Sequence, residues 1–229
     1  MVALFFCTKP MLKMGSLKSI DLPFDFIMPS VISSSVLHQT ISWPEYYAIA
    51  KGYIESDEKP ELYRNEKMLR YTADNIRRMD HVLQAINIES KLYNLLTSMQ
   101  TDLTWVVLTS PWCGDASQVV PVLYTIASCS ERIAYRILMS DEHPEIMNAY
   151  LTDGSQSIPK LICLKTETLE ELGTWGPRPA ALQQIVLENK DRSDISFGAK
   201  VRMVHDWYAN DKTQSIQEEF IDLVKNWNT

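Results

Sequence analysis

One cysteine of this chain stands where sulfur chemistry is favoured. Cys113 lies in the segment SPWCGDASQ, residues 110–118, directly before a predicted helix over residues 114–128. Unpaired backbone N–H groups and the positive end of the helix dipole favour a thiolate at such a position, which lowers the pKa of the thiol. We therefore expect Cys113 to be the most reactive of the four cysteines.

The second sulfur of a dithiol site is missing from this segment. In a Cys-x-x-Cys motif the residue three after Cys113 would be a cysteine, and here it is Ala116. A mixed disulfide on Cys113 therefore cannot be released by attack from within the motif. The other cysteines are scattered, without zinc-ligand spacing, which predicts no metal site and favours a reducing, cytoplasmic compartment. They are Cys7, Cys129 and Cys163.

Two charged residues bear on the reactivity of this sulfur. Asp115 lies in the first turn of the predicted helix, where its negative charge opposes a thiolate. The helix dipole and a partly exposed carboxylate each contribute about 0.3–1 kcal/mol, so neither clearly wins. Arg178 in TWGPRP, held between two prolines, offers a cation. Two interpretations stay open: Arg178 lies in the same groove as the sulfur, or it pairs with Asp115 or caps a neighbouring helix.

Composition and charge narrow the class of protein. The chain has 229 residues, 45% of them hydrophobic, which is enough for one good-sized domain with an extension. A formal charge of −7 without a long basic run predicts no nucleic-acid or anionic-membrane partner. No stretch reaches the roughly 20 apolar residues of a membrane span. Residues 1–39 are interpreted as a flexible leader or as sequence upstream of the true start.

The elements that must position Cys113 follow from hydrophobic periodicity. Residues 40–100 are predicted to be helical, and residues 101–190 to alternate as β-α-β-α-β-β-α, which indicates a mixed sheet flanked by helices. Residues 191–229 contribute two more amphipathic helices, expected to pack on the front helices or the sheet. The predicted front helices span residues 43–54, 61–86 and 88–99. The predicted strands span residues 103–110, 132–139, 160–164 and 168–175, the last two as a hairpin.

Three landmarks in the middle of the chain resemble the thioredoxin superfamily. They are the strand TWVVLTS followed by Trp112-Cys113-Gly114, Pro121 eight residues after the cysteine, and an Ile-Pro pair before the strand in SIPKLICL. The resemblance covers about residues 100–190 and implies an α/β thioredoxin-like fold with extra helices at both termini. It also implies that Pro159 is a cis-proline.

Shorter stretches are similar to a little-characterised bacterial branch of this family, with WCGDA in place of WCGPC. They are WCGDAS, YLTDGSQSIPKL, WGPRP, YTADNIRRMD upstream and WYANDK near the end. Because two of them lie outside residues 100–190, the flanking helices are expected to belong to the architecture.

The resemblance implies a site around Cys113 as nucleophile. Ser157 and Ile158 would present their backbone to an extended peptide. The residues implied to form the groove are Trp112, Gly114, Asp115, Ser157, Ile158, Pro159, Trp175, Gly176 and Arg178. The chain departs from the family at Ala116 and at Val107, where typical thioredoxins bury an aspartate. Both departures argue against an ordinary dithiol reductase.

Three hypotheses follow from these residues. In the first, Cys113 performs monothiol exchange without a cofactor, with a protein disulfide or a low-molecular-weight thiol as partner. In the second, the protein is a redox-inactive binding module that holds a peptide or small ligand in the groove. A third, an iron–sulfur site, is disfavoured because Ser117 stands one residue later than the serine of monothiol glutaredoxins. The first requires a sulfur that is accessible and close to Pro159.

Overall fold

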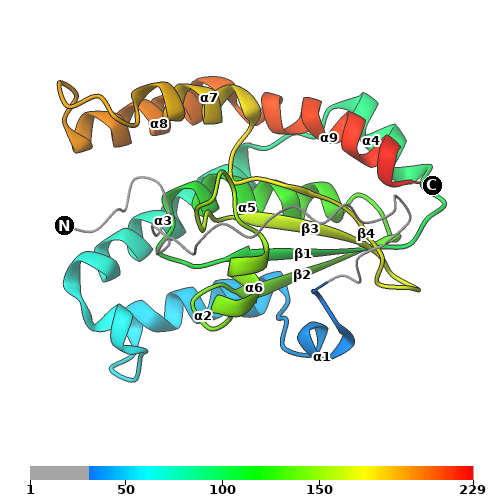
Figure 1. Ribbon diagram of the computed structural model, residues 1–229, viewed down its shortest axis with the longest axis horizontal. Helices are drawn as coiled ribbons and strands as arrows, with labels where there is room; N and C mark the ends of the chain where they lie inside the picture. Colours follow the sequence, from blue (N-terminus) through cyan, green and yellow to red (C-terminus); the bar gives the residue numbers. More distant parts are fainter. Residues whose placement is uncertain (1–30, 229) are drawn as a thin grey trace, which may run out of the picture.

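A four-stranded mixed sheet forms the centre of the molecule. The computed structural model describes residues 31–228. The strands are β1 (Leu103–Thr109), β2 (Ile133–Met139), β3 (Lys160–Lys165) and β4 (Glu171–Trp175). They lie in the order β2-β1-β3-β4, with β1 and β2 parallel and the pairs β1–β3 and β3–β4 antiparallel. The predicted thioredoxin-like α/β fold with a mixed sheet is confirmed (Figure 1).

Strand β1 is the centre of the core. All seven of its residues are buried, as expected of a strand covered on both faces. The helices that follow the strands are α5 (Gly114–Ala127), α6 (Pro144–Ala149) and α7 (Ala180–Asn189). The β3–β4 hairpin is present, but β4 begins three residues later than predicted. Residues before it form a turn in which Leu169 adopts a left-handed φ of 58°.

The front part of the chain is helical, as predicted. Its elements are α1 (Ser34–Leu37), α2 (Trp43–Glu55), the 3-10 helix Glu61–Arg64, α3 (Glu66–Ala85) and α4 (Ser90–Thr97). The capping box of Ser42 and Glu45 begins α2. The single helix predicted over residues 61–86 is divided, because the Asn65 side chain accepts hydrogen bonds from the backbone of Lys67 and Met68 and begins α3 there.

Part of the segment interpreted as a leader belongs to the folded structure. Within residues 31–39, α1 is formed and Ile32 is completely buried. Just after it, Ile41 forms an antiparallel bridge with Ile137 at the outer edge of β2. The interpretation of residues 1–39 as a leader is therefore wrong for residues 31–39, and the rest of it lies outside the described residues.

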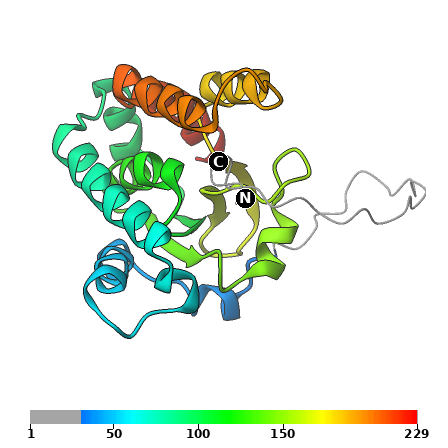
Figure 2. The same ribbon diagram turned by 90° about the vertical axis from the view of Figure 1, so that its left-hand side faces the viewer.

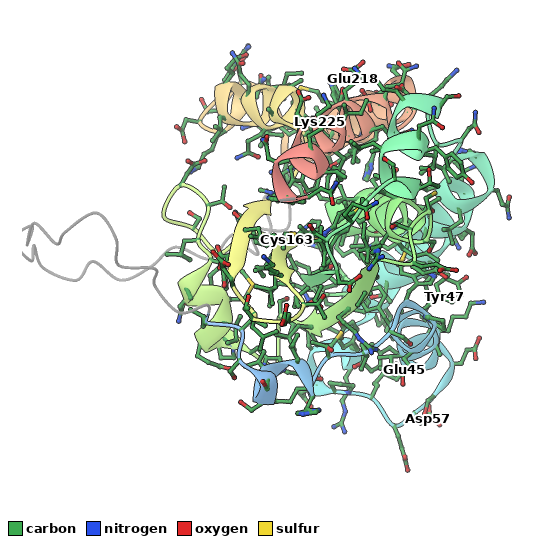
Figure 3. All side chains as sticks on the ribbon, turned by 90° about the vertical axis from the view of Figure 1, so that its right-hand side faces the viewer. Glu45, Tyr47, Asp57, Cys163, Glu218 and Lys225 are labelled. Carbon is green, nitrogen blue, oxygen red and sulfur yellow. The ribbon has the colours of Figure 1, made fainter. Side chains whose placement is uncertain are left out.

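Helix α9 (Gln214–Trp227) covers the sheet directly. The ring of Phe220 lies 5.3 Å, between centroids, from Trp105 of β1 and 5.3 Å from Trp175 of β4. A Cβ at Gly173 would lie 2.8 Å from the Trp227 indole nitrogen, so glycine lets this ring rest on β4. The apolar face of α9 is buried here, while Glu218 and Lys225 project from its outer side (Figure 3).

The two terminal extensions are joined to each other. The Gln217 side chain accepts from the Glu89 backbone N–H at 2.8 Å and donates to the Asn87 carbonyl at 3.1 Å. Helices α4, α7, α9 and α8 (Phe197–Asp211) lie along one side of the sheet, and α1 and α2 lie next to its β2 edge (Figures 1 and 2). The extra helices therefore form part of the layers around the sheet.

Candidate active site

Cys113 begins helix α5 at the end of the central strand. Its backbone N–H donates to the Ser110 carbonyl at 3.1 Å, which closes the turn between β1 and α5. It is the N-cap residue, without a side-chain cap. Its sulfur lies 3.3 Å from the Ile158 carbonyl oxygen, and the Ile158–Pro159 peptide bond is cis. The structure thus brings Cys113 and Gly114 to the loop that carries Ile158 and Pro159.

The Cys113 sulfur and the loop beside it are buried and do not line an open groove. Cys113 is 1% exposed, Ile158 3% and Ser157 4%. Cys129 and Cys163, in contrast, are free cysteines away from this loop, in the turn after α5 and in β3. Ser157 and Ile158, implied to present their backbone to an extended peptide, are therefore buried in this structure.

The loop after β4 packs against the cis-proline. The Gly176–Pro177 peptide bond is also cis, which the sequence analysis did not predict. Gly176 has a φ of +108°, and a Cβ there would lie 2.5 Å from the Pro159 carbonyl oxygen. Only glycine fits both the backbone conformation and the close approach. The loop of residues 175–179 is therefore held beside Pro159.

Arg178 pairs with Asp115. Its Nε and Nη2 donate to the two carboxylate oxygens at 2.9 and 2.6 Å, and the side chains of Arg178 and Asp115 are 2% and 5% exposed. Burial opposes the charged guanidinium, but the charge of Asp115, the neighbouring Tyr208 and the hydrogen bond to Asp115 together outweigh it, and the pKa of Arg178 is raised. Of the two interpretations of Arg178, the structure adopts the ion pair.

This pairing removes two of the electrostatic effects expected at Cys113. The carboxylate of Asp115 is buried and neutralised, so its repulsion of a thiolate is offset, and the guanidinium is engaged by its partner. Tyr208 adds a hydrogen bond to Asp115 at 3.1 Å, and Gln183 accepts from Arg178 at 3.0 Å. The cluster of Asp115, Arg178, Gln183 and Tyr208, here called the Asp115 cluster, locks α5 to the loop after β4 and to α8.

Trp175 and Trp112, both implied to line the groove, have different partners. Its ring packs on Phe220 and its indole donates to Glu219 of α9 at 2.6 Å, because an apolar ring on the edge strand needs a cover and α9 supplies it. Trp112 is half-buried and donates to Asp141 at 2.9 Å. Ser157 and Arg178 line a small cavity of about 30 Å³, room for about one water molecule.

Residues from both extensions reach the start of α5, and their sequence pattern did not indicate a place in the site. Asn75 of α3 donates to the Pro111 carbonyl at 2.8 Å. His205 of α8 lies over Gly114, with its Cε1 3.9 Å from where a Cβ would stand. Burial lowers the pKa of His205, helped by the charge of Arg78. Asn75 lies in the stretch YTADNIRRMD and Tyr208 in WYANDK. The resemblance of these two stretches to the family was therefore the sequence feature that could have indicated their contacts with the site.

The remaining candidates for a second redox group are occupied elsewhere. The Ser117 hydroxyl donates to the Gly114 carbonyl at 2.6 Å. Cys163 is buried in β3 (Figure 3), and burial raises its pKa; burial also raises the pKa of Cys129. Among residues 31–228 no group of three or more His, Cys, Asp or Glu side chains could hold a metal ion. Within the same residues no helix is long and apolar enough to cross a membrane.

Comparison with known proteins places the chain in a family. No curated protein matches it. A solved structure of a protein of unknown function from Pseudomonas aeruginosa is similar, with 14% identity and a TM-score of 0.55 over 85% of this chain and 98% of that one. An HIV epitope scaffold matches with 15% identity and a TM-score of 0.47 over 81% and 98% of the two chains.

The family model described as Thioredoxin matches residues 62–195, more than half of the chain. Its match begins at Leu62, before α3, so it includes much of the helical segment that the sequence analysis separated from the thioredoxin-like domain. The chain belongs to the thioredoxin family.

Proposed function

We propose that the protein exchanges thiols and disulfides through Cys113 as a single nucleophile. The observation that supports this most is the place of the Cys113 sulfur, at the start of α5 and 3.3 Å from the Ile158 carbonyl beside cis-Pro159. The backbone N–H groups of the first turn favour a thiolate there.

The exchange begins with Cys113 in its reduced form. The Cys113 thiolate attacks one sulfur of a disulfide R–S–S–R′, a Cys113–S–S–R bond forms, and R′–S⁻ leaves and takes up a proton. An external thiolate R″–S⁻ then attacks the sulfur of R, the R–S–S–R″ disulfide forms, and the Cys113 thiolate is restored. No net oxidation takes place, since one disulfide is consumed and one is formed.

The neighbouring residues have distinct tasks in this proposal. Asn75 anchors the Pro111 carbonyl, and the Asp115 cluster fixes the first turn of α5 without leaving a net charge beside the sulfur. A reduced thiol that keeps the 3.3 Å distance to the Ile158 carbonyl would donate a hydrogen bond to it, and this bond would stabilise the protonated form. Attack therefore requires the sulfur to turn from this carbonyl toward the incoming disulfide.

The burial of the site favours a second candidate function. With Cys113 1% exposed and the Ser157–Pro159 backbone buried, a redox-inactive module that holds a peptide or small ligand at the cis-proline loop is the alternative. In that case the reduced sulfur is an ordinary thiol, alkylated with a midpoint near pH 8.5. In the redox case the midpoint falls below about pH 6.5.

A thiol-transfer assay on the pre-reduced protein separates these candidates. The substrate is a mixed disulfide between a small thiol and a peptide, and a second small thiol is the reductant. We expect Cys113→Ser to lose turnover and the matched variants Cys129→Ser and Cys163→Ser to keep it. Equal turnover by the wild type and Cys113→Ser contradicts the proposal.

The same assay tests whether one thiol suffices. Cys7 lies outside the described residues, and Cys7→Ser is expected to keep its turnover in the monothiol proposal. A loss as large as that of Cys113→Ser would show that two cysteines of the chain act together. Binding of the peptide without turnover, unchanged by Cys113→Ser, would support the binding module.

A further inference from the structure

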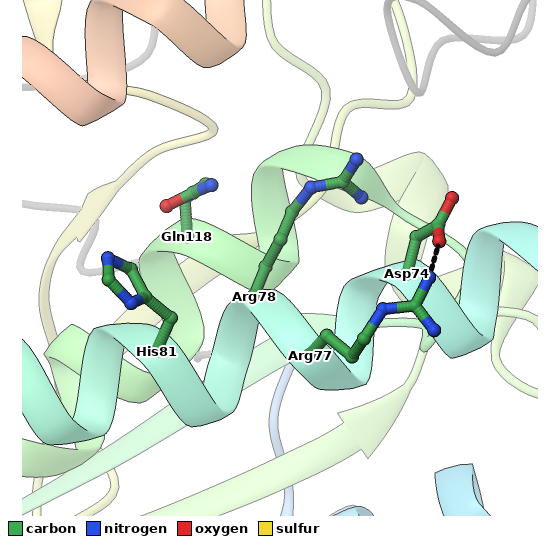
Figure 4. Close-up of a pocket in the computed structure, with 5 residues that line it drawn as sticks. All are labelled: Asp74, Arg77, Arg78, His81 and Gln118. Atoms are coloured by element: carbon green, nitrogen blue, oxygen red, sulfur yellow. Dashed lines mark hydrogen bonds and ion pairs between the residues drawn. The ribbon is translucent and has the colours of Figure 1, made fainter.

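A second pocket lies on the α3 side of helix α5. Its volume is about 340 Å³, within the usual range for small-molecule sites. Asp74, Arg77, Arg78 and His81 line it from α3, and Gln118 lines it from α5 (Figure 4). None of these residues has a part in the proposed thiol chemistry.

Arg78 is the unusual member of this pocket. It is half-buried, and burial lowers its pKa, as expected of a cation that has lost part of its hydration. Its guanidinium donates to the neutral Asn75 amide oxygen at 2.8 Å. Within residues 31–228 no carboxylate lies within 4.0 Å of Arg78. Arg77, in contrast, pairs with Asp74 (Figure 4).

The charge of the pocket suits an anion. Two guanidinium groups and one carboxylate line it, which leaves one positive charge in excess when His81 is neutral. A guanidinium matches the geometry of a carboxylate or phosphate through two parallel hydrogen bonds. The Gln118 amide, on the opposite wall, supplies a further N–H donor. An oxyanion bound here would restore the partner that the half-buried Arg78 lacks.

The pocket is a neighbour of Cys113 without including it. Gln118 is five residues after Cys113 on α5, a rise of about 7.5 Å along the helix. Arg78 is linked to the loop before Cys113 through Asn75, which bonds the Pro111 carbonyl. We infer that this pocket is a binding site for the oxyanion group, carboxylate or phosphate, of a small molecule, with Arg78 as its principal ligand.

Nuclear magnetic resonance of the full chain tests this inference. Inorganic phosphate and acetate are titrated separately at constant ionic strength, and the Arg78 Nε–H and Gln118 side-chain amide signals are followed. We expect saturable shifts of both signals. The tighter of the two probes identifies the preferred oxyanion.

Two substitutions and one control make the test specific. Arg78→Gln is expected to weaken binding at least about tenfold, because a charge-assisted hydrogen bond is about twice as strong as a neutral one. Gln118→Leu removes a donor without changing the charge and is expected to weaken binding less. Arg70→Gln, at an exposed arginine of the same helix outside the pocket, is expected to leave binding unchanged.

The inference fails if neither probe gives a saturable shift. It also fails if Arg70→Gln weakens binding as much as Arg78→Gln, since that result indicates diffuse attraction to the charge of α3. Cys113→Ser is expected to bind both probes like the wild type. A failed thiol-transfer assay therefore does not contradict the anion site, and a failed anion titration does not contradict the thiol exchange.

Discussion

The two sides of the start of helix α5 hold an arginine in opposite ways. On one side, Arg178 is almost completely buried, and its charge is matched by both carboxylate oxygens of Asp115. On the other, Arg78 is half-buried, and the group it bonds is the neutral side chain of Asn75. Arg178 therefore stabilises the fold through an ion pair, whereas the guanidinium of Arg78 can pair with the oxyanion of a ligand.

Within the described part of the chain, the cation near Cys113 that lacks a carboxylate partner is Arg78, and not Arg178 as one interpretation of the sequence suggested. From its sequence context between two prolines, Arg178 was a candidate to line the groove, but its partner Asp115 was already present in the first turn of α5. Arg78 has charged residues on both sides in the sequence, so the local pattern does not distinguish it from an ordinary surface arginine. A half-buried guanidinium without a carboxylate is recognised only when α3 and α5 are placed side by side.

The largest expected effect breaks the ion pair on the first side. Arg178→Met leaves the Asp115 carboxylate buried without its cation, which is expected to lower the free energy of unfolding by about 3–5 kcal/mol. Arg78→Met strands no carboxylate and is expected to change it by less than about 1 kcal/mol. Urea denaturation of both variants measures the difference. Equal losses contradict the distinction between the two arginines.

The double variant Asp115→Asn with Arg178→Met sharpens this result. Removing both charges avoids an unpaired buried ion, so the double variant is expected to recover a large part of the loss. If it is as unstable as Arg178→Met alone, the loss comes from packing of the arginine stem and not from the stranded charge.

A smaller effect is expected from the glycine that holds the first side in place. Gly176→Ala must accommodate a Cβ 2.5 Å from the Pro159 carbonyl oxygen at a φ of +108°, which is expected to cost about 2 kcal/mol or more. Gly52→Ala is the control, because nothing lies within 4 Å of its Cβ and it lies in helix α2. It is expected to stabilise the protein by about 0.5–1 kcal/mol. Similar denaturation midpoints for the two variants contradict this account of Gly176.

The smallest expected effect is a change in the pH dependence of the free energy of unfolding, caused by His205. Because burial and Arg78 lower its pKa, the unfolded chain takes up this proton more readily than the folded protein. The free energy of unfolding should therefore decrease as the pH falls below about 6.5, the ordinary value for histidine. His205→Gln is expected to reduce this slope between pH 7 and 5, and His38→Gln, at an exposed histidine, to leave it unchanged. Identical slopes in all three proteins contradict the prediction.

Much of the fold was predictable because its signals are local. The capping box at Ser42, the buried run of β1 and the period of α5 each lie within a dozen residues. The break at Asn65 was missed, since a capping residue inside a polar helical pattern resembles an ordinary surface residue.

The site was predictable only in part because its contacts are distant in sequence. Cys113 and the loop of Pro159 were assigned through the family resemblance, and the pairing of Arg178 with Asp115 was one of two interpretations. The contact of Trp175 with α9 was not predicted, because α9 lies some 40 residues later and no local pattern indicates it. The roles of His205 and Tyr208 depend on how α8 crosses the start of α5, which periodicity does not determine.

The most direct test of the central claim is competitive alkylation of the reduced, folded protein. Iodoacetamide is added in limiting amount at pH 7, and modification of each cysteine is measured by mass spectrometry. The account predicts that Cys113 is alkylated well before Cys129 and Cys163, whose pKa values are raised by burial. If reduced Cys113 reacts no faster than Cys163, the sulfur at the start of α5 is sealed in the folded protein and the proposed thiol exchange is wrong.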